Sequence, residues 1–510
     1  MTLLGLKNQE TDRRDPAQER FDSAVVSVEQ MIAADRAAIK AGTAGFDLML
    51  AAGQSVANKV EELYPHHHVL ILCGAGNNGG DGYIAASLLA QAGRQVTVLA
   101  TGRNWRLHGD AARARRHWGG KSGAFDPQAL AALPDETVVV DAVFGTGFRG
   151  ALAPPVTDIF AAVGQKKWPV IAVDVPSGVY GDRGEADPYT LQAQHSVTFF
   201  RKKMAHLFTP ARSLCGYVSV HDIGIAPDIM TQTGATAFEN DPCLWASLLP
   251  RPGQESHKYE RGHVVVLGGA QMTGAGRMAS ESCMRTGAGL CTVAADADSA
   301  AIYKKGAPHI MVESLSGGVA GFAAHLSDAR RNVAVLGPGA GLDDRHGLQQ
   351  AVLETLATGK AVVLDADALS CFEGEAARLL DALHENCVLT PHEGEFTRLF
   401  PDLDGHKFDR AMAAAARAGA VILLKGAETI IARHDKMPVV NIHATPWLAT
   451  AGAGDVLAGM IAGFAAQGVA TFDAACAASW IHGESASRKG PGLVAPDIIE
   501  GIPSVLRDFA

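Results

Sequence analysis

The chain is long enough for two to four domains, and its composition excludes a disordered or fibrous protein. It has 510 residues, of which 47% are hydrophobic and 19% are charged, whereas disorder requires low hydrophobicity and high charge. The net charge of −10 lacks the basic excess that nucleic-acid-binding proteins usually show, so we expect no nucleic-acid partner. The 56 glycines follow no G-x-y period, which excludes collagen and predicts many tight turns.

Cysteine usage and hydropathy predict a cytoplasmic protein. The eight cysteines are scattered and form no C-x-x-C pair, which is typical of reduced, buried thiols. The first residues lack the apolar segment of a signal peptide. The most apolar stretch, around 456–466, is interrupted by glycine and is too short to span a bilayer. We therefore expect no membrane segment, and we expect residues 1–23 to be a loose leader.

The first half of the chain alternates helical and strand patterns. Two helical segments follow residue 27 and are separated at Gly42–Gly45. Apolar runs at 66–72, 95–100, 138–145 and 169–178 then alternate with helices such as 109–118. Strands that alternate with helices of about ten to fifteen residues are typical of a parallel sheet with crossover helices. The periodicity fades over 222–252, where prolines cluster, and we place a domain boundary near residue 240.

The second half restarts the alternation and predicts a second α/β domain. The runs HVVVLGG, LCTVAA, VAVLGPGAG, AVVLDADAL, CVLTPH and AVILLKGAETIIA each predict a strand that ends in polar or small residues. The expected domains are therefore 24–240 and 241–510. Ligands of open parallel sheets bind at the carboxyl ends of the strands, so the polar residues there are the candidates for chemistry.

A glycine-rich string, GAGNNGGDG at Gly74–Gly82, lies between a predicted strand and a predicted helix starting at Tyr83. Glycines let backbone N–H groups approach an anion, and the dipole of the helix favours one, so the loop suits a phosphate. No acidic residue closes the next strand, which disfavours a standard NAD-dependent oxidoreductase. A plain tight turn is the alternative interpretation.

Polar residues also follow three strands of this predicted sheet. Asn78, Asp141 and Ser177 offer hard oxygen ligands that suit an alkali or alkaline-earth cation. The same residue types are favoured as helix N-caps, and the pattern alone leaves both interpretations open. The basic run Arg201–Lys203 is expected to be a solvated surface, with a phosphate-attracting rim as the alternative.

The strings GAGNNGGDG, VVDAVFGTGFRG and AVDVPSG occur in this order, and the region 24–225 resembles the NAD(P)H-hydrate epimerase family. The resemblance implies a Rossmann-like parallel α/β sandwich, a K⁺ ion on Asn78, Asp141 and Ser177, and hydrated NAD(P)H as substrate. It implies Asp174 as the acid/base group, because epimerisation requires a proton to move; ion or ribose binding without proton transfer is the alternative. The implied substrate contacts are Asn77, Asn78, Gly79, Gly80, Asp81, Gly145, Thr146, Gly147, Phe148, Arg149, Gly150, Ala151 and Asp174.

A turn of small residues, Ala449–Asp455, precedes an apolar helix in the second half. Backbone N–H groups at such a helix start bind an anion. An Asp in the turn can accept a proton from a hydroxyl that attacks a phosphoryl group. The G-x-G-D turn resembles that of the ribokinase-like kinase fold, and an Asp N-cap with small packing residues is the alternative.

Further strings resemble the ADP/ATP-dependent NAD(P)H-hydrate dehydratase family over 250–505: GGAQMTGAGRMAS, LGPGAG, LDADAL, TPHEGEFTRL and LLKGAETIIA. The resemblance implies that Asp455 activates the ring hydroxyl for phosphorylation by ADP or ATP, with Mg²⁺ bound mainly through the nucleotide phosphates. The implied substrate contacts are Ala275, Gly341, His392 and Asp455. The implied nucleotide contacts are Lys425, Gly426, Ala427, Glu428, Thr429 and Gly454. Together, the two halves resemble the bifunctional NAD(P)H-hydrate repair family, which implies a homo-oligomer.

Some positions depart from the family pattern or allow another interpretation. The anion turn has Ala451 and Ala453 where the family has Gly and Thr, and Gly276 stands in place of a proline. An ordinary surface lysine is the alternative interpretation of Lys425. His392 could instead be a hydrogen-bonded histidine, or it could form half of a metal site with the second Glu of HEGE, Glu395. The alternative function is a ribokinase-like small-molecule kinase with a non-catalytic, nucleotide-binding N-terminal module.

Overall fold

The structure is a computed structural model that describes residues 21–101 and 107–510, and it divides into two compact units. Unit 1 runs to His206 and includes Pro210–Ala235, and unit 2 comprises Leu207–Thr209 and Thr236–Ala510. Most of the predicted leader, residues 1–20, lies outside the described residues. The domain limits at residue 240 stay a prediction; in the structure, strand β10 (Ala237–Glu239) pairs with a strand of unit 2.

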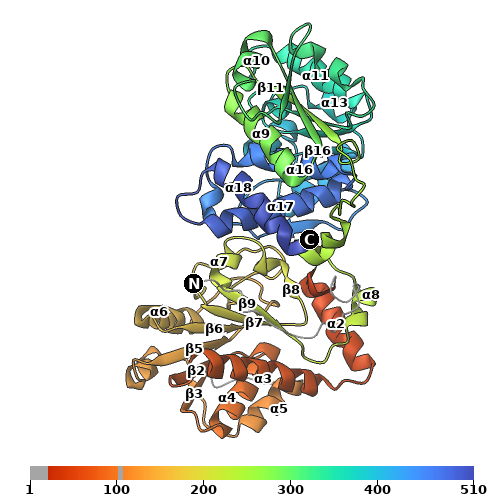
Figure 1. The fold of residues 1–510 in the computed structure, drawn as a ribbon. Coiled ribbons are helices and arrows are strands. Elements are labelled where there is room, and N and C mark those ends of the chain that lie inside the picture. Colours follow the sequence, from red (N-terminus) through yellow and green to blue (C-terminus); the bar gives the residue numbers. More distant parts are fainter. Residues whose placement is uncertain (1–20, 102–106) are drawn as a thin grey trace. The chain divides into compact units, whose positions relative to one another are not determined.

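Unit 1 is built on a parallel sheet with the strand order β4-β3-β2-β5-β6-β7-β9 (Figure 1). Both faces are covered, which explains why the central strands are almost continuously apolar. In β2, Leu70 and Leu72 pack with helix α6, whereas Ile71 and Cys73 face helix α4. The strands are β2 (His68–Cys73), β3 (Val96–Ala100), β4 (Gly123–Ala124), β5 (Thr137–Ala142), β6 (Val170–Val173), β7 (His195–Phe199) and β9 (Tyr217–His221). The helices are α2 (Val28–Lys40), α3 (Gly45–Leu63), α4 (Asn77–Gln91), α5 (Gly109–Trp118), α6 (Val156–Lys166), α7 (Ala211–Cys215) and α8 (Met230–Thr233).

Helix α4 begins at Asn77, not at Tyr83, so the predicted glycine loop is shorter than expected. A Cβ on Gly79 would lie 2.0 Å from the Gly74 carbonyl oxygen, and one on Gly82 would lie 2.6 Å from the Ala142 Cβ. These glycines are therefore helical residues that allow the helix to pack closely on the strand ends. The low helix propensity of glycine led to the prediction of a loop. Close packing on the strand ends overrides that propensity here.

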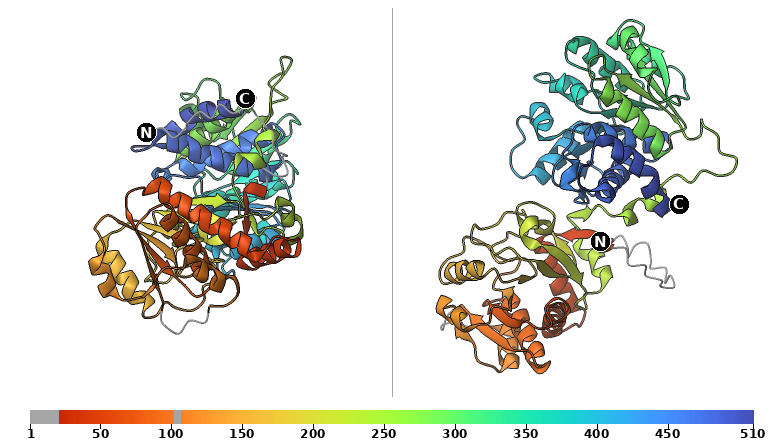
Figure 2. Two further views of the ribbon diagram at one scale, coloured as in Figure 1. Left: turned by 90° about the horizontal axis from the view of Figure 1, so that it is seen from below. Right: turned by 60° about the vertical axis from the view of Figure 1, so that its left-hand side comes forward.

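Unit 2 has parallel strands in the order β13-β12-β11-β14-β15-β16-β17, followed by the antiparallel strands β18 and β19 and by β10, which is parallel to β19. Helices α9, α16 and α18 pack against one another (Figures 1 and 2). The strands are β11 (His263–Gly268), β12 (Leu290–Ala295), β13 (Met311–Ser314), β14 (Val333–Leu336), β15 (Ala361–Leu364), β16 (Cys387–Leu389), β17 (Val421–Leu424), β18 (Thr429–Ala432) and β19 (Val439–Asn441). The helices are α9 (Thr273–Thr286), α10 (Ala297–Tyr303), α11 (Arg345–Leu356), α12 (Asp367–Ser370), α13 (Ala376–Leu380), α14 (Glu393–Leu399), α15 (Lys407–Ala418), α16 (Ala453–Ala466), α17 (Thr471–Lys489) and α18 (Ala495–Leu506).

The string AVILLKGAETIIA is a hairpin, not the single strand that was predicted. Its two halves, β17 and β18, pair antiparallel, with Leu424 opposite Ile430. The apolar residues run almost continuously through both halves, so hydropathy did not reveal the reversal at Lys425–Glu428. This hairpin brings the predicted nucleotide contacts into one turn.

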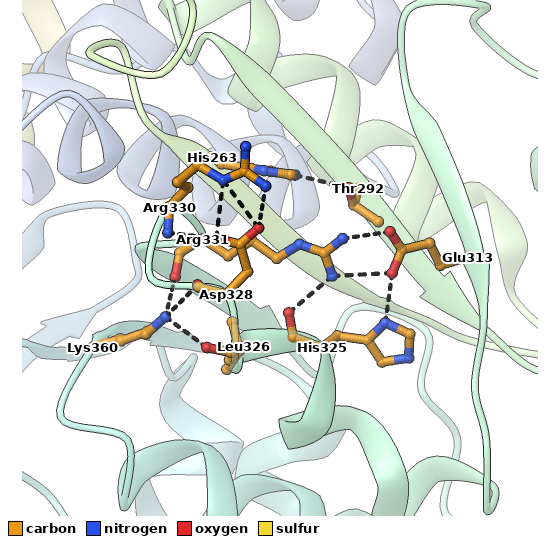
Figure 3. Close-up of polar contacts among 9 residues, drawn as sticks. All are labelled: His263, Thr292, Glu313, His325, Leu326, Asp328, Arg330, Arg331 and Lys360. Atoms are coloured by element: carbon orange, nitrogen blue, oxygen red, sulfur yellow. Dashed lines mark hydrogen bonds and ion pairs between the residues drawn. The ribbon is translucent and has the colours of Figure 1, made fainter.

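A polar network ties together the segments next to the amino ends of β14 and β15 (Figure 3). Lys360 Nζ donates to the Leu326 carbonyl at 2.6 Å and to the Asp328 carbonyl at 2.9 Å. Arg331 pairs with Glu313, which also contacts His325 Nδ1 at 2.7 Å. The contacts of Lys360 satisfy loop carbonyls at the amino ends of these strands. The candidate site of unit 2, described below, lies at carboxyl ends of strands in the same sheet. Within the described part of the chain, none of the helices is both long and apolar enough to cross a bilayer.

Candidate active sites

Unit 1 contains a cavity of about 730 Å³ at the carboxyl ends of β2, β5 and β6. Helices α2 and α3, the start of α4, the loop after β5 and a residue of strand β8 (Lys202–Lys203) line it. The predicted contacts Gly79, Gly80 and Gly150 do not line this cavity. The predicted contacts that do are Asn77, Asn78, Asp81, Gly145, Thr146, Gly147, Phe148, Arg149, Ala151 and Asp174.

Asp174 directly follows β6 and is held at both carboxylate oxygens. Its Oδ1 accepts hydrogen bonds from Lys203 Nζ at 2.8 Å and from Thr198 Oγ1 at 2.8 Å. Its Oδ2 accepts from the Thr146 backbone N–H at 3.2 Å and from Thr146 Oγ1 at 3.0 Å. The backbone of Asp174 has φ +66°, a left-handed conformation that is uncommon for a non-glycine residue. Such strain, kept in place by surrounding bonds, is typical of functional sites.

Lys203 fixes the charge of Asp174. The lysine side chain is 1% exposed and Arg201 is also buried, so the expected solvated surface at Arg201–Lys203 is wrong for both residues. Burial raises the pKa of Asp174, but the charge and the hydrogen bond of Lys203 outweigh it, and the pKa is lowered overall. Asp174 is therefore ionised at neutral pH, which favours binding by this residue over proton transfer.

His206 fixes the backbone beside this ion pair. Its Nδ1 accepts from the Lys203 backbone N–H at 2.9 Å, so Nε2 carries the proton that it donates to the Asp174 carbonyl at 3.0 Å. Burial lowers the pKa of His206 to about 4, and the ring is neutral. Sequence reasoning missed Lys203, Thr198 and His206, because they lie on and beyond a strand that no motif marked.

The predicted K⁺ ligands lie beside the cavity. Asp141 is fully buried, and its carboxylate accepts from Ser177 Oγ at 2.5 Å and from the Ser177 backbone N–H at 2.8 Å. Burial raises the pKa of Asp141 to about 6, against the hydrogen bonds from Ser177 and Val143. Among the described residues, Asn78 Nδ2 is buried and has no hydrogen-bond partner. A Cβ on Gly145 would lie 3.0 Å from Asn78 Oδ1, so glycine leaves the amide oxygen accessible.

This set of oxygen donors fits a cation. The hydrogen-bond partners of the buried Asp141 carboxylate are neutral, and amide, hydroxyl and carboxylate oxygens are ligands of hard cations. The described residues contain no cluster of three or more His, Cys, Asp or Glu side chains that would hold a transition metal. The H-x-x-E metal interpretation therefore has no third ligand of this kind in the described ranges.

The candidate site of unit 2 centres on an ion pair at the carboxyl ends of β15 and β17. Lys425 Nζ donates to Asp365 Oδ1 at 2.7 Å, and Asp365 is 2% exposed. Gly454 is close to both, since a Cβ built on it would lie 3.5 Å from Lys425 Nζ and 3.7 Å from Asp365 Oδ2. Lys425 is thus not a free surface lysine. Asp365 was not predicted as a site residue, although the string LDADAL contains it.

Asp455 lies in the first turn of α16, where the N-cap Gly452 has φ +88°. Burial, and to a smaller extent the charge of Asp365, raise the pKa of Asp455 to about 6, whereas Lys425 lowers it. A carboxyl group with this pKa accepts a proton efficiently near neutral pH. The turn is anchored by His482, whose Nε2 contacts the Ala453 carbonyl at 2.9 Å.

The predicted nucleotide contacts Lys425–Thr429 form the turn of the hairpin. Lys407 Nζ donates to the Lys425 carbonyl at 3.2 Å and to the Glu428 carbonyl at 2.7 Å. A Cβ on Gly426 would lie 2.2 Å from that Nζ, so glycine lets the lysine pass close to the turn. The turn is therefore rigidly held next to Asp365.

The other predicted substrate contacts occupy neighbouring loops. The Gly341 backbone N–H donates to Asp367 Oδ2 at 2.9 Å, and Ala275 is buried in the first turn of α9. His392 is the N-cap of α14: its Nδ1 accepts from the Gly394 backbone N–H at 2.9 Å, and Glu395 accepts from the His392 backbone N–H at 2.8 Å. The capping box explains the spacing of His392 and Glu395. Among the described residues, no hydrogen bond joins His392 or Ala275 to Asp455.

The fold and the two sites define a two-unit α/β protein that joins a Rossmann-like sheet to a ribokinase-like domain. Comparison with known proteins agrees. The family model described as NAD(P)H-hydrate dehydratase matches residues 264–503, and the model described as YjeF-related protein N-terminus matches residues 45–205.

Full-length relatives cover both units. The chain is 34% identical over 494 residues to the bifunctional NAD(P)H-hydrate repair enzyme of Moorella thermoacetica, covering 91% of this chain and 92% of that one. It is 35% identical over 511 residues to the enzyme of the same name from Pyrobaculum aerophilum, covering 95% and 98%. A solved ADP/ATP-dependent NAD(P)H-hydrate dehydratase from Bacillus subtilis is 27% identical over 52% of this chain and 96% of that chain, with a TM-score of 0.46. The chain belongs to the bifunctional NAD(P)H-hydrate repair family.

Proposed function

We propose that this protein repairs hydrated NAD(P)H with two activities, an epimerase in unit 1 and an ADP/ATP-dependent dehydratase in unit 2. One observation carries the proposal: a single chain aligns over more than nine-tenths of its length with relatives named for bifunctional repair. The separate polar sites of the two units support it. The dehydratase acts on one epimer, and the epimerase recycles the other.

In unit 2, we infer that Asp455 takes the proton of the ring hydroxyl, so that the oxygen can accept a phosphoryl group. Its raised pKa supports this role, because a base with a pKa of about 6 is ionised at pH 7 and still binds a proton usefully. Lys425 and the N–H groups at the start of α16 face the phosphates. Loss of phosphate then restores the double bond of the dihydronicotinamide ring.

In unit 1, the volume of the cavity, about 730 Å³, is in the range of small-molecule and cofactor sites. We infer that the ionised Asp174 binds the substrate through its carboxylate, while Thr146 and Lys203 hold it in position. The role of Asp174 as the acid/base group remains a prediction.

Two metal ions complete the proposal. Asn78, Asp141 and Ser177 would hold K⁺, which would neutralise the buried Asp141 carboxylate. Mg²⁺ would bind mainly through the nucleotide phosphates in unit 2. Assembly into a homo-oligomer remains a prediction.

The dehydratase half is tested with the purified S epimer of hydrated NADH (NADHX), Mg²⁺ and either ADP or ATP. We expect NADH absorbance and inorganic phosphate to appear together in a one-to-one ratio. A stable phosphorylated product without NADH would reject the dehydratase and support the small-molecule kinase.

A further inference from the structure

Asp35 lines the cavity of unit 1 but was not predicted as a site residue. It lies in helix α2 and outside residues 45–205, the segment matched by the family model. Strand β1 (Ala24–Val26) pairs in parallel with β8, which places Val26 opposite Lys203. Helix α2 begins two residues later, so it runs from the strand that borders the buried lysine.

The start of α2 is rigidly fixed. Ser27 forms a capping box with Gln30, and the Val28 backbone N–H donates to Asp182 Oδ1 at 2.7 Å. The helix therefore carries Asp35 along the cavity wall as part of an anchored element.

Asp35, Asp81, Asp174 and Lys203 all line this cavity. Burial raises the pKa of Asp35 to about 6; Lys203 lowers this pKa and Asp174 raises it. Burial, Asp174 and Asp35 raise the pKa of Asp81 well above its ordinary value. The titratable and charged groups that line the cavity with Asp35 are Lys203 from β8, Asp174 after β6, Asp81 from α4, Asp110 from α5 and Arg149 from the loop after β5.

The four central groups thus differ in protonation. Lys203 and Asp174 form an ion pair, burial favours the protonated form of Asp81, and the pKa of Asp35 is about 6. Two carboxyl groups whose environments separate their pKa values are typical of an acid and a base that act together.

We propose that Asp35 is a catalytic residue of unit 1, which takes and returns the hydroxyl proton of the hydrated nicotinamide ring, with Asp81 as its partner acid. The inference rests on the proposed epimerase function. In this account Asp35 of α2 transfers the proton, and Asp174 binds the substrate.

The chemistry follows from the reacting carbon, which bears a hydroxyl and is bonded to the ring nitrogen. Asp35 takes the hydroxyl proton, and the O–H electron pair forms a C=O bond as the C–N bond breaks. The ring nitrogen receives the C–N electron pair and a proton from Asp81. Rotation exposes the other face of the carbonyl, and ring closure reverses each transfer. Asp35 ends ionised and Asp81 ends protonated, as they began.

The test measures conversion of one purified NADHX epimer to the other by the full-length protein, without ADP or ATP, after subtraction of the spontaneous rate. Asp35→Asn is compared with Glu29→Gln, which removes an exposed carboxylate from the same helix. Asp35→Glu tests rescue by a conservative variant.

We expect the wild-type rate to fall below about pH 6. Asp35→Asn should lower kcat about 100-fold with little change in KM, and should abolish that fall. Asp35→Glu restores part of kcat, Glu29→Gln is unchanged, and dehydratase activity is unchanged in all three. An Asp35→Asn variant with near wild-type kcat, or with the same fall in rate at low pH (the acid limb of the pH–rate profile), overturns the inference. Either result is compatible with the epimerase activity itself. A wild type that does not exceed the spontaneous rate instead rejects the epimerase itself, and the inference with it.

Discussion

Lys203 and Asp174 form a buried ion pair at the wall of the unit 1 cavity. Their Nζ–Oδ1 distance is 2.8 Å, and the lysine side chain is 1% exposed. Hydrogen bonds from Thr146 and Thr198 satisfy the carboxylate as well. Breaking such a pair by removing one partner is costly, because the remaining charge stays buried.

Lys203→Met is therefore expected to lower the free energy of unfolding of unit 1 by about 3–5 kcal/mol. The double variant Lys203→Met/Asp174→Asn should recover a large part of that loss, because no charge is left unpaired. Chemical denaturation followed by circular dichroism measures both, with the exposed Lys40→Met as control. A single variant as stable as this control would contradict the role of the pair.

The dehydratase rate is expected to fall as the pH decreases below about 6. Asp455 has a pKa of about 6 in the folded protein, and it must be ionised to take a proton. Asp455→Asn should lower kcat at least 100-fold and leave epimerisation unchanged. A variant that keeps the rate and its acid limb would exclude Asp455 as the base.

Asp455→Asn is also expected to stabilise the protein at pH 7–8. The pKa of Asp455 in the folded state is raised above the ordinary value, so ionisation costs stability as the pH rises through about 4 to 6. The neutral amide removes that cost, and the melting temperature should rise at pH 8 but not at pH 4. An equal effect at both pH values would contradict the electrostatic explanation.

Asp365→Asn should shift the acid limb of the dehydratase toward lower pH. The negative charge of Asp365 helps to raise the pKa of Asp455, and it also holds Lys425 through a 2.7 Å contact. We expect a lower kcat together with the shifted limb in a pH–rate profile. A loss of rate with an unshifted limb would assign Asp365 a purely structural role.

Potassium should raise the melting temperature of the wild-type protein more than sodium at equal ionic strength, because a ligand of the native state stabilises it. Asp141→Asn removes the charge that the buried set of oxygens presents, and should abolish the difference between the two salts. Thermal unfolding in KCl and NaCl checks this without any substrate. An undiminished difference in the variant would place the ion elsewhere.

Gly79→Ala should destabilise unit 1 strongly, because the new Cβ would lie 2.0 Å from the Gly74 carbonyl oxygen. Gly164 lies in helix α6, and no atom is found within 4 Å of its Cβ among the described residues. Gly164→Ala should therefore stabilise by about 0.5–1 kcal/mol, the ordinary helix-propensity gain. Denaturation of the two variants in parallel separates close packing from backbone flexibility as the reason for the glycine at position 79.

Sequence patterns correctly predicted the alternation of strands and helices, because the strands are buried on both faces and are nearly continuously apolar. They also located Asp174 and Asp455 at strand and helix ends, where a parallel sheet gathers its polar residues. They did not locate Lys203 or Asp365, since a pairing partner distant in sequence leaves no local pattern. Asp35 was not predicted as a site residue for a related reason. Within helix α2 it has the spacing of an ordinary polar residue, and only the fold places it at the cavity.

The most direct test of the bifunctional assignment is absorbance at 340 nm during incubation of the purified protein with a mixture of both NADHX epimers, Mg²⁺, K⁺ and ADP or ATP. We expect recovery of NADH from the whole mixture, faster than spontaneous epimerisation allows. Recovery that stops at the fraction of one epimer would contradict the epimerase, and the absence of recovery with either nucleotide would contradict the dehydratase.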